Sequence, residues 1–202
     1  MKLLLTILMA TTLFTAGCNN PFTATERKII GNGNEMMRVT TIDNEADSTL
    51  LRRTSRPLRK KDVLSEEFST LCRRMLATVQ NPENEGVGIA APQVGILRRV
   101  VAVQRFDKEG EPFEFYVNPE IVEFGDEMEL GGEGCLSVPD FSGDVWRAQR
   151  IVIKYRDENF SEHTDTIEGF TAVIFQHEID HLDGILYIDR MEEDDQEEEY
   201  EE

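Results

Sequence analysis

The feature that most constrains the fold of this 202-residue chain is the stretch at residues 170–184. Five residues recur at the three-and-four spacing of one helical face, and no proline interrupts them: Phe170, Val173, Ile174, His177 and His181. Gly184 comes directly after the periodic residues, where a glycine can take the left-handed conformation that ends a helix. The pattern predicts a helix over residues 170–184.

Two histidines in this predicted helix are placed to share a metal ion. His177 and His181 are four residues apart, so their imidazoles lie on one face, and Glu178 stands beside them as a base for water. An apolar wall next to such a site suggests a substrate with an apolar side chain. Two histidines at this spacing can also be packed, hydrogen-bonded residues, and a third ligand would decide between the two interpretations.

Length and charge limit the other possibilities. A chain of 202 residues with 40% hydrophobic content is expected to form one domain with a real core. The net charge of −19 argues against direct nucleic-acid binding, which depends on clustered Lys and Arg. Nine acidic residues fall between residues 192 and 202, and we interpret residues 191–202 as an acidic, disordered tail without chemistry.

The first 18 residues have the composition of an export signal. A basic start is followed by a short apolar run and then by Thr15-Ala-Gly-Cys18, which resembles a bacterial lipoprotein signal whose cysteine is lipidated. This hypothesis predicts a membrane anchor through Cys18. The alternative is that translation starts near Met36 or Met37, which predicts a cytoplasmic protein. Residues 19–36 are polar, with little periodicity, and are predicted to be a linker in both cases.

The two remaining cysteines have different surroundings. Cys72 lies on the apolar face of a helix predicted to begin at Ser65, and is expected to be a core residue. Cys135 lies in the glycine-rich segment 131–139 and could be a nucleophile, a metal ligand or neither. A nucleophilic cysteine needs a histidine base, yet His177 and His181 already form the predicted metal-binding pair. We therefore favour a thiolate ligand.

The middle of the chain reads as strands joined by turns. Strands are predicted at residues 97–106, 113–117, 121–124 and 151–156, and near Thr166. Gly86, Gly88 and Ala91 have the spacing of a dinucleotide-binding loop, but the segment follows a predicted helix and leads into Pro92, so we reject that interpretation. Strands paired by nearby turns favour an α+β fold.

Three motifs together carry a family resemblance. Gly86-Val-Gly-Ile-Ala-Ala-Pro-Gln93, Glu133-Gly-Cys-Leu-Ser137 and Gln176-His-Glu-Ile-Asp-His-Leu-Asp-Gly184 resemble the three signature motifs of the peptide deformylases, in order and at compatible spacings. The resemblance implies a catalytic domain over residues 37–190, with antiparallel β-sheets packed around a central metal-binding helix. It also implies removal of the formyl group from the N-terminal formylmethionine of new polypeptides, with release of formate. The ribosome is a candidate place for this step.

The resemblance assigns roles to particular residues. It implies one divalent metal, Fe(II) in the first place and Zn, Ni or Co as alternatives, held by Cys135, His177 and His181. Glu178 would be the general acid/base, and Gln93 with the backbone N–H of Leu136 would form the oxyanion hole. Residues expected near the substrate are Val87, Gly88, Glu133, Arg147, Phe170, Val173 and Ile174. Trp146 stands where several family members have proline.

Two alternatives belong to other classes. Residues 177–187 follow the metzincin protease pattern except at the last position of that pattern. There, Tyr187 stands in place of the required third histidine. An exported metallopeptidase is therefore disfavoured. The second alternative is an inactive, lipid-anchored binding protein that kept the fold, which the intact catalytic positions argue against.

Overall fold

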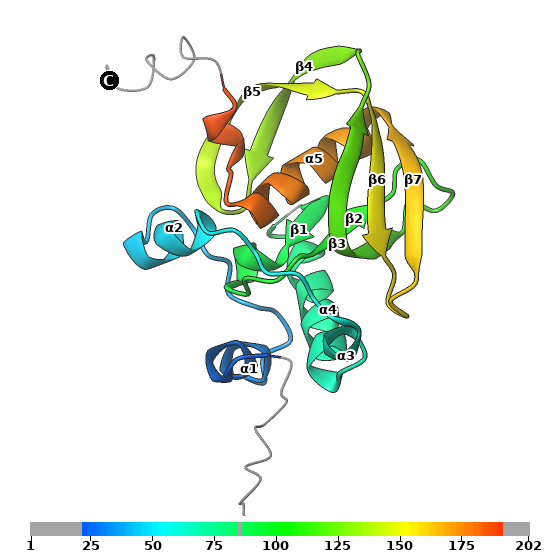
Figure 1. The fold of residues 1–202 in the computed structure, drawn as a ribbon. Helices are drawn as coiled ribbons and strands as arrows, with labels where there is room; N and C mark the ends of the chain where they lie inside the picture. Colours follow the sequence, from blue (N-terminus) through cyan, green and yellow to red (C-terminus); the bar gives the residue numbers. More distant parts are fainter. Residues whose placement is uncertain (1–21, 85, 192–202) are drawn as a thin grey trace, which may run out of the picture.

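The computed structural model describes residues 22–84 and 86–191 (Figure 1). The predicted signal segment at residues 1–18, with Cys18, lies outside the described residues, as do residues 192–202 of the predicted tail. No helix within residues 22–84 and 86–191 is long and apolar enough to cross a membrane.

The described chain forms two antiparallel sheets and a set of helices. The five-stranded sheet has the order β1-β2-β3-β6-β7, and β4 pairs only with β5. The strands are β1 (Gly88–Ala90), β2 (Val100–Gln104), β3 (Phe113–Phe124), β4 (Met128–Cys135), β5 (Val138–Ala148), β6 (Arg150–Arg156) and β7 (Glu162–Glu168). The helices are α1 (Ala24–Ile30), α2 (Glu45–Leu51), α3 (Lys60–Val63), α4 (Glu66–Val79) and α5 (Gly169–Asp183), with 3-10 turns η1 (Ala91–Val94) and η2 (Tyr187–Asp189). The predicted α+β fold is confirmed.

Helix α5 lies between the large sheet and the β4–β5 hairpin, as Figure 1 shows. It spans Gly169–Asp183, and Gly184 ends it in the left-handed conformation with φ 78°. Ala172, Phe175 and Leu182 are fully buried against strands of the large sheet. Because this helix is buried on nearly all sides, its two histidines are held by the core of the protein.

Helix α4 belongs to the second core cluster, with residues of β1 and β2. Ser65 caps its N-terminus by accepting a hydrogen bond from the Phe68 N–H at 3.2 Å, as predicted. Leu71 and Met75 are fully buried in this cluster, and Cys72 packs against it. Burial, together with the charge of Glu158, raises the pKa of the Cys72 thiol to about 12. The predicted core role of Cys72 is confirmed.

Residues 113–124 form one strand where the sequence predicted two. β3 continues through Asn118 and Pro119, with a register shift against β6 between Val117 and Glu120. Asn118 adopts a left-handed backbone with φ 50°, a conformation that asparagine tolerates better than most residues. Its side chain accepts from the Leu58 N–H and donates to the Leu58 carbonyl, both at 2.8 Å. The irregularity that suggested a break is a bulge fixed by these bonds.

The predicted linker at residues 19–36 contains a docked helix. Thr23 and Glu26 form a capping box at the start of α1, and Phe22 and Ile30 are 2% exposed in the α4 cluster. The buried Arg74 of α4 donates to the carbonyls of Ile29 and Ile30 at 2.8 and 2.6 Å. The linker prediction relied on polarity and weak periodicity and did not use the helix-start signal of this segment. A Thr followed three residues later by Glu is a readable helix start.

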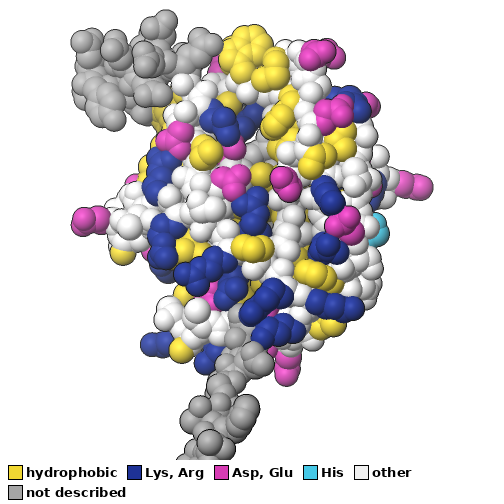
Figure 2. All heavy atoms as spheres, in the orientation of Figure 1, with side chains coloured by type: hydrophobic (Ala, Val, Ile, Leu, Met, Phe, Trp, Pro, Cys, Tyr) yellow, Lys and Arg dark blue, Asp and Glu magenta, His cyan; other side chains and the backbone are white. Residues whose placement is uncertain are grey.

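Charge is unevenly distributed on the surface. Figure 2 shows Lys and Arg side chains gathered over the lower part of one face, although the whole chain has a net charge of −19. Exposed basic residues in the segment after α2 include Arg52, which pairs with Asp189, and Arg59, which pairs with Asp62. Part of the positive charge on the surface is therefore neutralised by ion pairs within the chain.

Candidate active site

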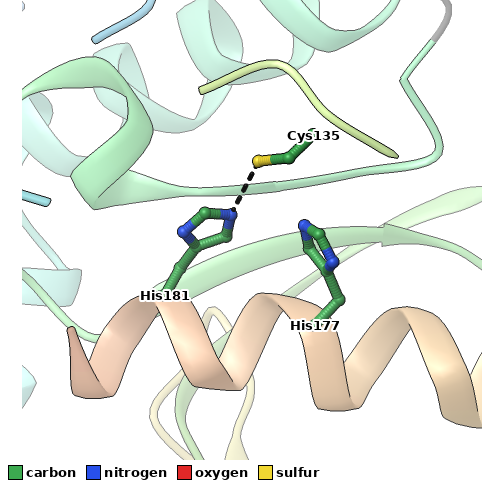
Figure 3. A group of neighbouring side chains, drawn as sticks. All are labelled: Cys135, His177 and His181. Carbon is green, nitrogen blue, oxygen red and sulfur yellow. Dashed lines mark hydrogen bonds between the residues drawn. The ribbon is translucent and has the colours of Figure 1, made fainter. Parts of the chain in front are cut away.

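Three side chains from two elements converge beside α5. The helix supplies His177 and His181, and the end of β4 supplies Cys135 (Figure 3). Their ligand atoms all lie within 4.8 Å of one another, and the Cys135 Sγ is 3.2 Å from the His181 Nε2. A thiolate with two imidazoles is a donor set for a transition metal rather than for Mg²⁺ or Ca²⁺. Cys135 thus lies beside the two histidines, where a third ligand was predicted.

The surroundings of Cys135 favour the charge state that metal binding requires. Burial by itself would raise the pKa of the Cys135 thiol, but the neighbouring imidazoles of His181 and His177 outweigh burial and hold that pKa well below its usual range. The thiolate is the form that ligates metals. The site therefore favours the anionic cysteine.

Glu178 follows His177 on α5, and its carboxylate is buried. The residue is 3% exposed, and burial raises the pKa of its carboxyl group to about 7. Gly88 of β1 makes room for it, because a Cβ at position 88 would collide with the Glu178 carboxylate. A carboxyl group with a pKa near neutrality can both accept and return a proton at the pH of a cell.

Gln93 is held in one orientation by the backbone. It lies in the turn η1 and is 2% exposed. Its Oε1 accepts from the Ala90 N–H at 2.8 Å, which leaves the amide Nε2 directed at the Cys135 Sγ, 3.5 Å away. A donor fixed in this way beside the three ligands is suited to meet negative charge that develops on a substrate oxygen.

A cavity of about 760 Å³ connects these groups. Of the predicted site residues, those that line it are Val87, Gly88, Gln93, Glu133, Cys135, Leu136, Phe170, Val173, Ile174, His177 and Glu178. The wall beyond the histidines is apolar, as the helix pattern predicted. Sequence reasoning did not single out the opposite wall, where Val138, Asp140 and Phe141 of β5 line the cavity.

Residues 36–197 match the family model described as polypeptide deformylase. The chain belongs to the peptide deformylase family. It is 40% identical to a peptide deformylase of Leptospira biflexa over 149 residues, which cover 70% of this chain and 82% of the relative. A peptide deformylase of Chlorobium phaeobacteroides is 43% identical over 155 residues, covering 74% of this chain and 79% of the relative.

The solved structures agree with the sequence comparison. A class I type b peptide deformylase from Acinetobacter baumannii with bound Met-Ala-Ser matches with a TM-score of 0.69 and 38% identity, over 77% of this chain and 98% of that one. As a peptide deformylase, the protein is a hydrolase that removes the formyl group from the N-terminal formylmethionine of new polypeptides, so the predicted function is confirmed. The comparisons do not support the exported metallopeptidase or the inactive binding protein.

Tyr187 gives the physical reason against the metallopeptidase alternative. It occupies the position where a metzincin needs its third histidine, and its hydroxyl donates to the Phe141 carbonyl at 2.9 Å. The ring stacks on His177, with centroids 6.0 Å apart. In this deformylase, Tyr187 thus packs against a predicted ligand and is not one itself.

Arg147, predicted near the substrate, does not line the main cavity of this deformylase but lines a smaller cavity of about 240 Å³ together with Phe170 and Val173. Its guanidinium is buried and donates to Glu133 at 2.6 and 3.1 Å and to Asp180 at 2.7 Å. Glu133 in turn meets the His177 Nδ1 at 2.7 Å. Asp180 was not among the predicted site residues. The available signal was its place between His177 and His181 within the proposed metal-binding motif.

Proposed function

We propose that this deformylase holds one divalent metal through Cys135, His177 and His181. The observation that supports the proposal is the convergence of these three ligand atoms within 4.8 Å. Three protein ligands are the number that catalytic metal sites use when one position stays open for chemistry. Fe(II) is the metal we propose, as the family resemblance implies, with Zn, Ni or Co as substitutes. Imidazole and thiolate donors suit transition metals of this kind better than Mg²⁺ or Ca²⁺. When bound, such a metal supplies Lewis-acid polarisation and lowers the pKa of water to about 7.

Glu178 is the proposed general acid/base. Its carboxylate would accept a proton from the attacking water and return it to the amine that leaves. The pKa of about 7, raised by burial, suits both halves of this task at neutral pH. The absence of a side chain at Gly88 leaves the space that the carboxylate occupies.

Gln93 and the backbone N–H of Leu136 are the proposed oxyanion donors. Negative charge develops on the formyl oxygen during the attack, and preorganised N–H groups stabilise it without further rearrangement. The Ala90 N–H fixes the Gln93 amide for this purpose. Loss of one such donor costs about 10²–10³ in kcat.

The methionine side chain of the substrate is proposed to lie against Val87, Phe170, Val173 and Ile174, which form the apolar part of the cavity wall. Gly88 and Glu133 border the same cavity. The related Acinetobacter enzyme was solved with Met-Ala-Ser bound, which supports a peptide with N-terminal methionine as the occupant. We propose that the enzyme meets its substrate as nascent chains emerge from the ribosome, in the cytoplasm.

The test is formate release from formyl-Met-Ala-Ser by the full chain, purified without oxygen and supplied with Fe(II) or Ni(II). We expect turnover that a chelator abolishes. Glu178→Ala should keep the metal and lose turnover by about 10²–10⁴. Glu168→Ala is the matched control, since Glu168 precedes the same helix and is exposed. Wild-type protein that binds metal but releases no formate would contradict the proposal, and near-normal turnover of Glu178→Ala would remove Glu178 from it.

A further inference from the structure

A chain of charged side chains runs from His177 to the surface. Glu133 meets the His177 Nδ1 at 2.7 Å, and Arg147 donates to Glu133. Arg147 also donates to Asp180 at 2.7 Å. At the outer end, Arg190 donates to both carboxylate oxygens of Asp180, at 2.7 and 2.6 Å. Each link is a charged hydrogen bond of ordinary length. The side chains of Glu133, Arg147, Asp180 and Arg190 therefore act as one unit.

The charges of this unit balance only when Arg190 is included. Glu133 and Asp180 are two carboxylates with side chains 6% and 10% exposed, and Arg147, at 5%, is the single guanidinium buried between them. Arg190 is 43% exposed and supplies the second positive charge. Without it, Asp180 would compete with Glu133 for Arg147, because a buried carboxylate lacking a partner is costly.

Arg190 belongs to a segment that touches both ligand-bearing elements. We name residues 186–191 the C-terminal clasp. Leu186, Tyr187 and Met191 form a small core with Val138 and Val145 of β5, and Cys135 packs against that core. A Cβ on Gly143 of β5 would collide with Met191. The clasp therefore lies against the hairpin that carries Cys135, while its Arg190 holds the helix that carries the histidines.

We propose that Arg190 is a positioning residue for the metal site. It neutralises Asp180, which leaves Arg147 free to hold Glu133, and Glu133 fixes the ring of His177 through its Nδ1. Hydrogen-bond partners of ligating histidines set ring orientation, and their loss usually lowers metal affinity 10–100-fold. This inference rests on the proposed function, since it takes His177 to be a metal ligand.

The experiment measures metal retention in the full chain. Ni(II)-loaded Arg190→Gln is mixed with excess chelator, and the rate of metal loss is compared with that of the wild type. Arg150→Gln is the matched control: Arg150 is 41% exposed and pairs with Glu123 at 2.7 Å, away from the metal ligands. We expect about tenfold faster loss from Arg190→Gln and an unchanged rate from Arg150→Gln. Arg190→Lys, which keeps the charge without the forked geometry, should restore part of the retention.

A second readout separates positioning from general destabilisation. The visible spectrum of the Co(II)-substituted protein reports the geometry of the thiolate and imidazole ligands, and it should change in Arg190→Gln but not in Arg150→Gln. Equal rates of metal loss and identical spectra in Arg190→Gln and wild type would overturn the proposal. Wild-type protein that fails to bind Ni(II) or Co(II) would instead refute the metal site itself, so the two failures are distinguishable.

Discussion

Both ends of the described chain are fastened to the body of the protein by arginines. At the N-terminal end, Arg74 binds the last carbonyls of α1, and Arg98 pairs with Glu26 at 2.8 Å. At the C-terminal end, Arg190 pairs with Asp180. The chemistry of the two attachments is alike, yet they lie over different parts of the molecule.

The difference lies in what each end covers. The buried residues Phe22 and Ile30 join the cluster around α4, and none of the proposed metal ligands belongs to that cluster. The buried residues of the C-terminal clasp join the cluster against which Cys135 packs. The N-terminal attachment should therefore contribute to stability alone, whereas the C-terminal one should also affect the metal. Four predictions test this contrast.

The largest effect is expected from removing residues 1–36. Phe22 and Ile30 are 2% exposed, and burial of an apolar side chain contributes about 1.5–3 kcal/mol, so the free energy of unfolding should fall by about 3–6 kcal/mol. Thr40, which remains, still donates to the Gln93 carbonyl at 2.8 Å. Turnover per folded, metal-loaded molecule should be unchanged. Denaturant unfolding and formate release measure the two quantities. A loss of turnover at full folding would break the contrast.

Arg74→Ala should show the N-terminal attachment within the full chain. The guanidinium donates to the carbonyls of Ile29, Ile30 and Met36 and to the Asn32 side chain. Hydrogen bonds from a charged group contribute more than neutral ones, and we expect a loss of about 2–4 kcal/mol in the free energy of unfolding. The neighbouring Arg73 is exposed, and Arg73→Ala should change the free energy of unfolding by no more than about 0.5 kcal/mol. Equal effects of the two variants would contradict the role of Arg74.

Glu26→Gln should give a smaller, pH-dependent effect. Burial tends to raise the pKa of the Glu26 carboxyl, but hydrogen bonds from Arg98 and Thr23 outweigh it and hold the pKa below its ordinary value. A lowered folded-state pKa contributes stability above the unfolded-state value, and this contribution is lost as the pH falls through the folded value. The variant should be about 1 kcal/mol less stable at pH 7 and approach the wild type below about pH 4. Unfolding curves at several pH values test this, and a deficit that grows in acid would refute it.

The smallest effect on stability is expected from Gly143→Ala in β5. The added Cβ meets the end of Met191, a flexible side chain that can move aside, so the cost in unfolding free energy should stay below about 1 kcal/mol. Because its clasp is displaced, the Gly143→Ala protein should nevertheless lose Ni(II) to a chelator faster than the wild type does. Gly131→Ala in β4 is the control, because nothing lies within 4 Å of its added Cβ. Equal metal loss from both variants would show that the clasp is dispensable.

The contrast also explains which predictions from sequence succeeded. Helix α5 was predicted to within one residue at each end, because its apolar and histidine periodicity and its terminal glycine are local signals. The segment before residue 36 was misjudged because its burial depends on Arg74 and the α4 cluster, which lie far along the chain. The capping box of Thr23 and Glu26 was local and could have been read.

The sequence by itself determined the helix that carries His177 and His181 on one face, since their spacing follows from helical geometry alone. The family motifs added Cys135 as the proposed third ligand, but not how it reaches the helix. Only the tertiary structure decided that Cys135 comes within 3.2 Å of His181 and that Arg147 turns toward Glu133 and Asp180. These contacts depend on how the β4–β5 hairpin packs against α5. Charge pairing in a buried space selects that arrangement, and no local pattern along the chain encodes it.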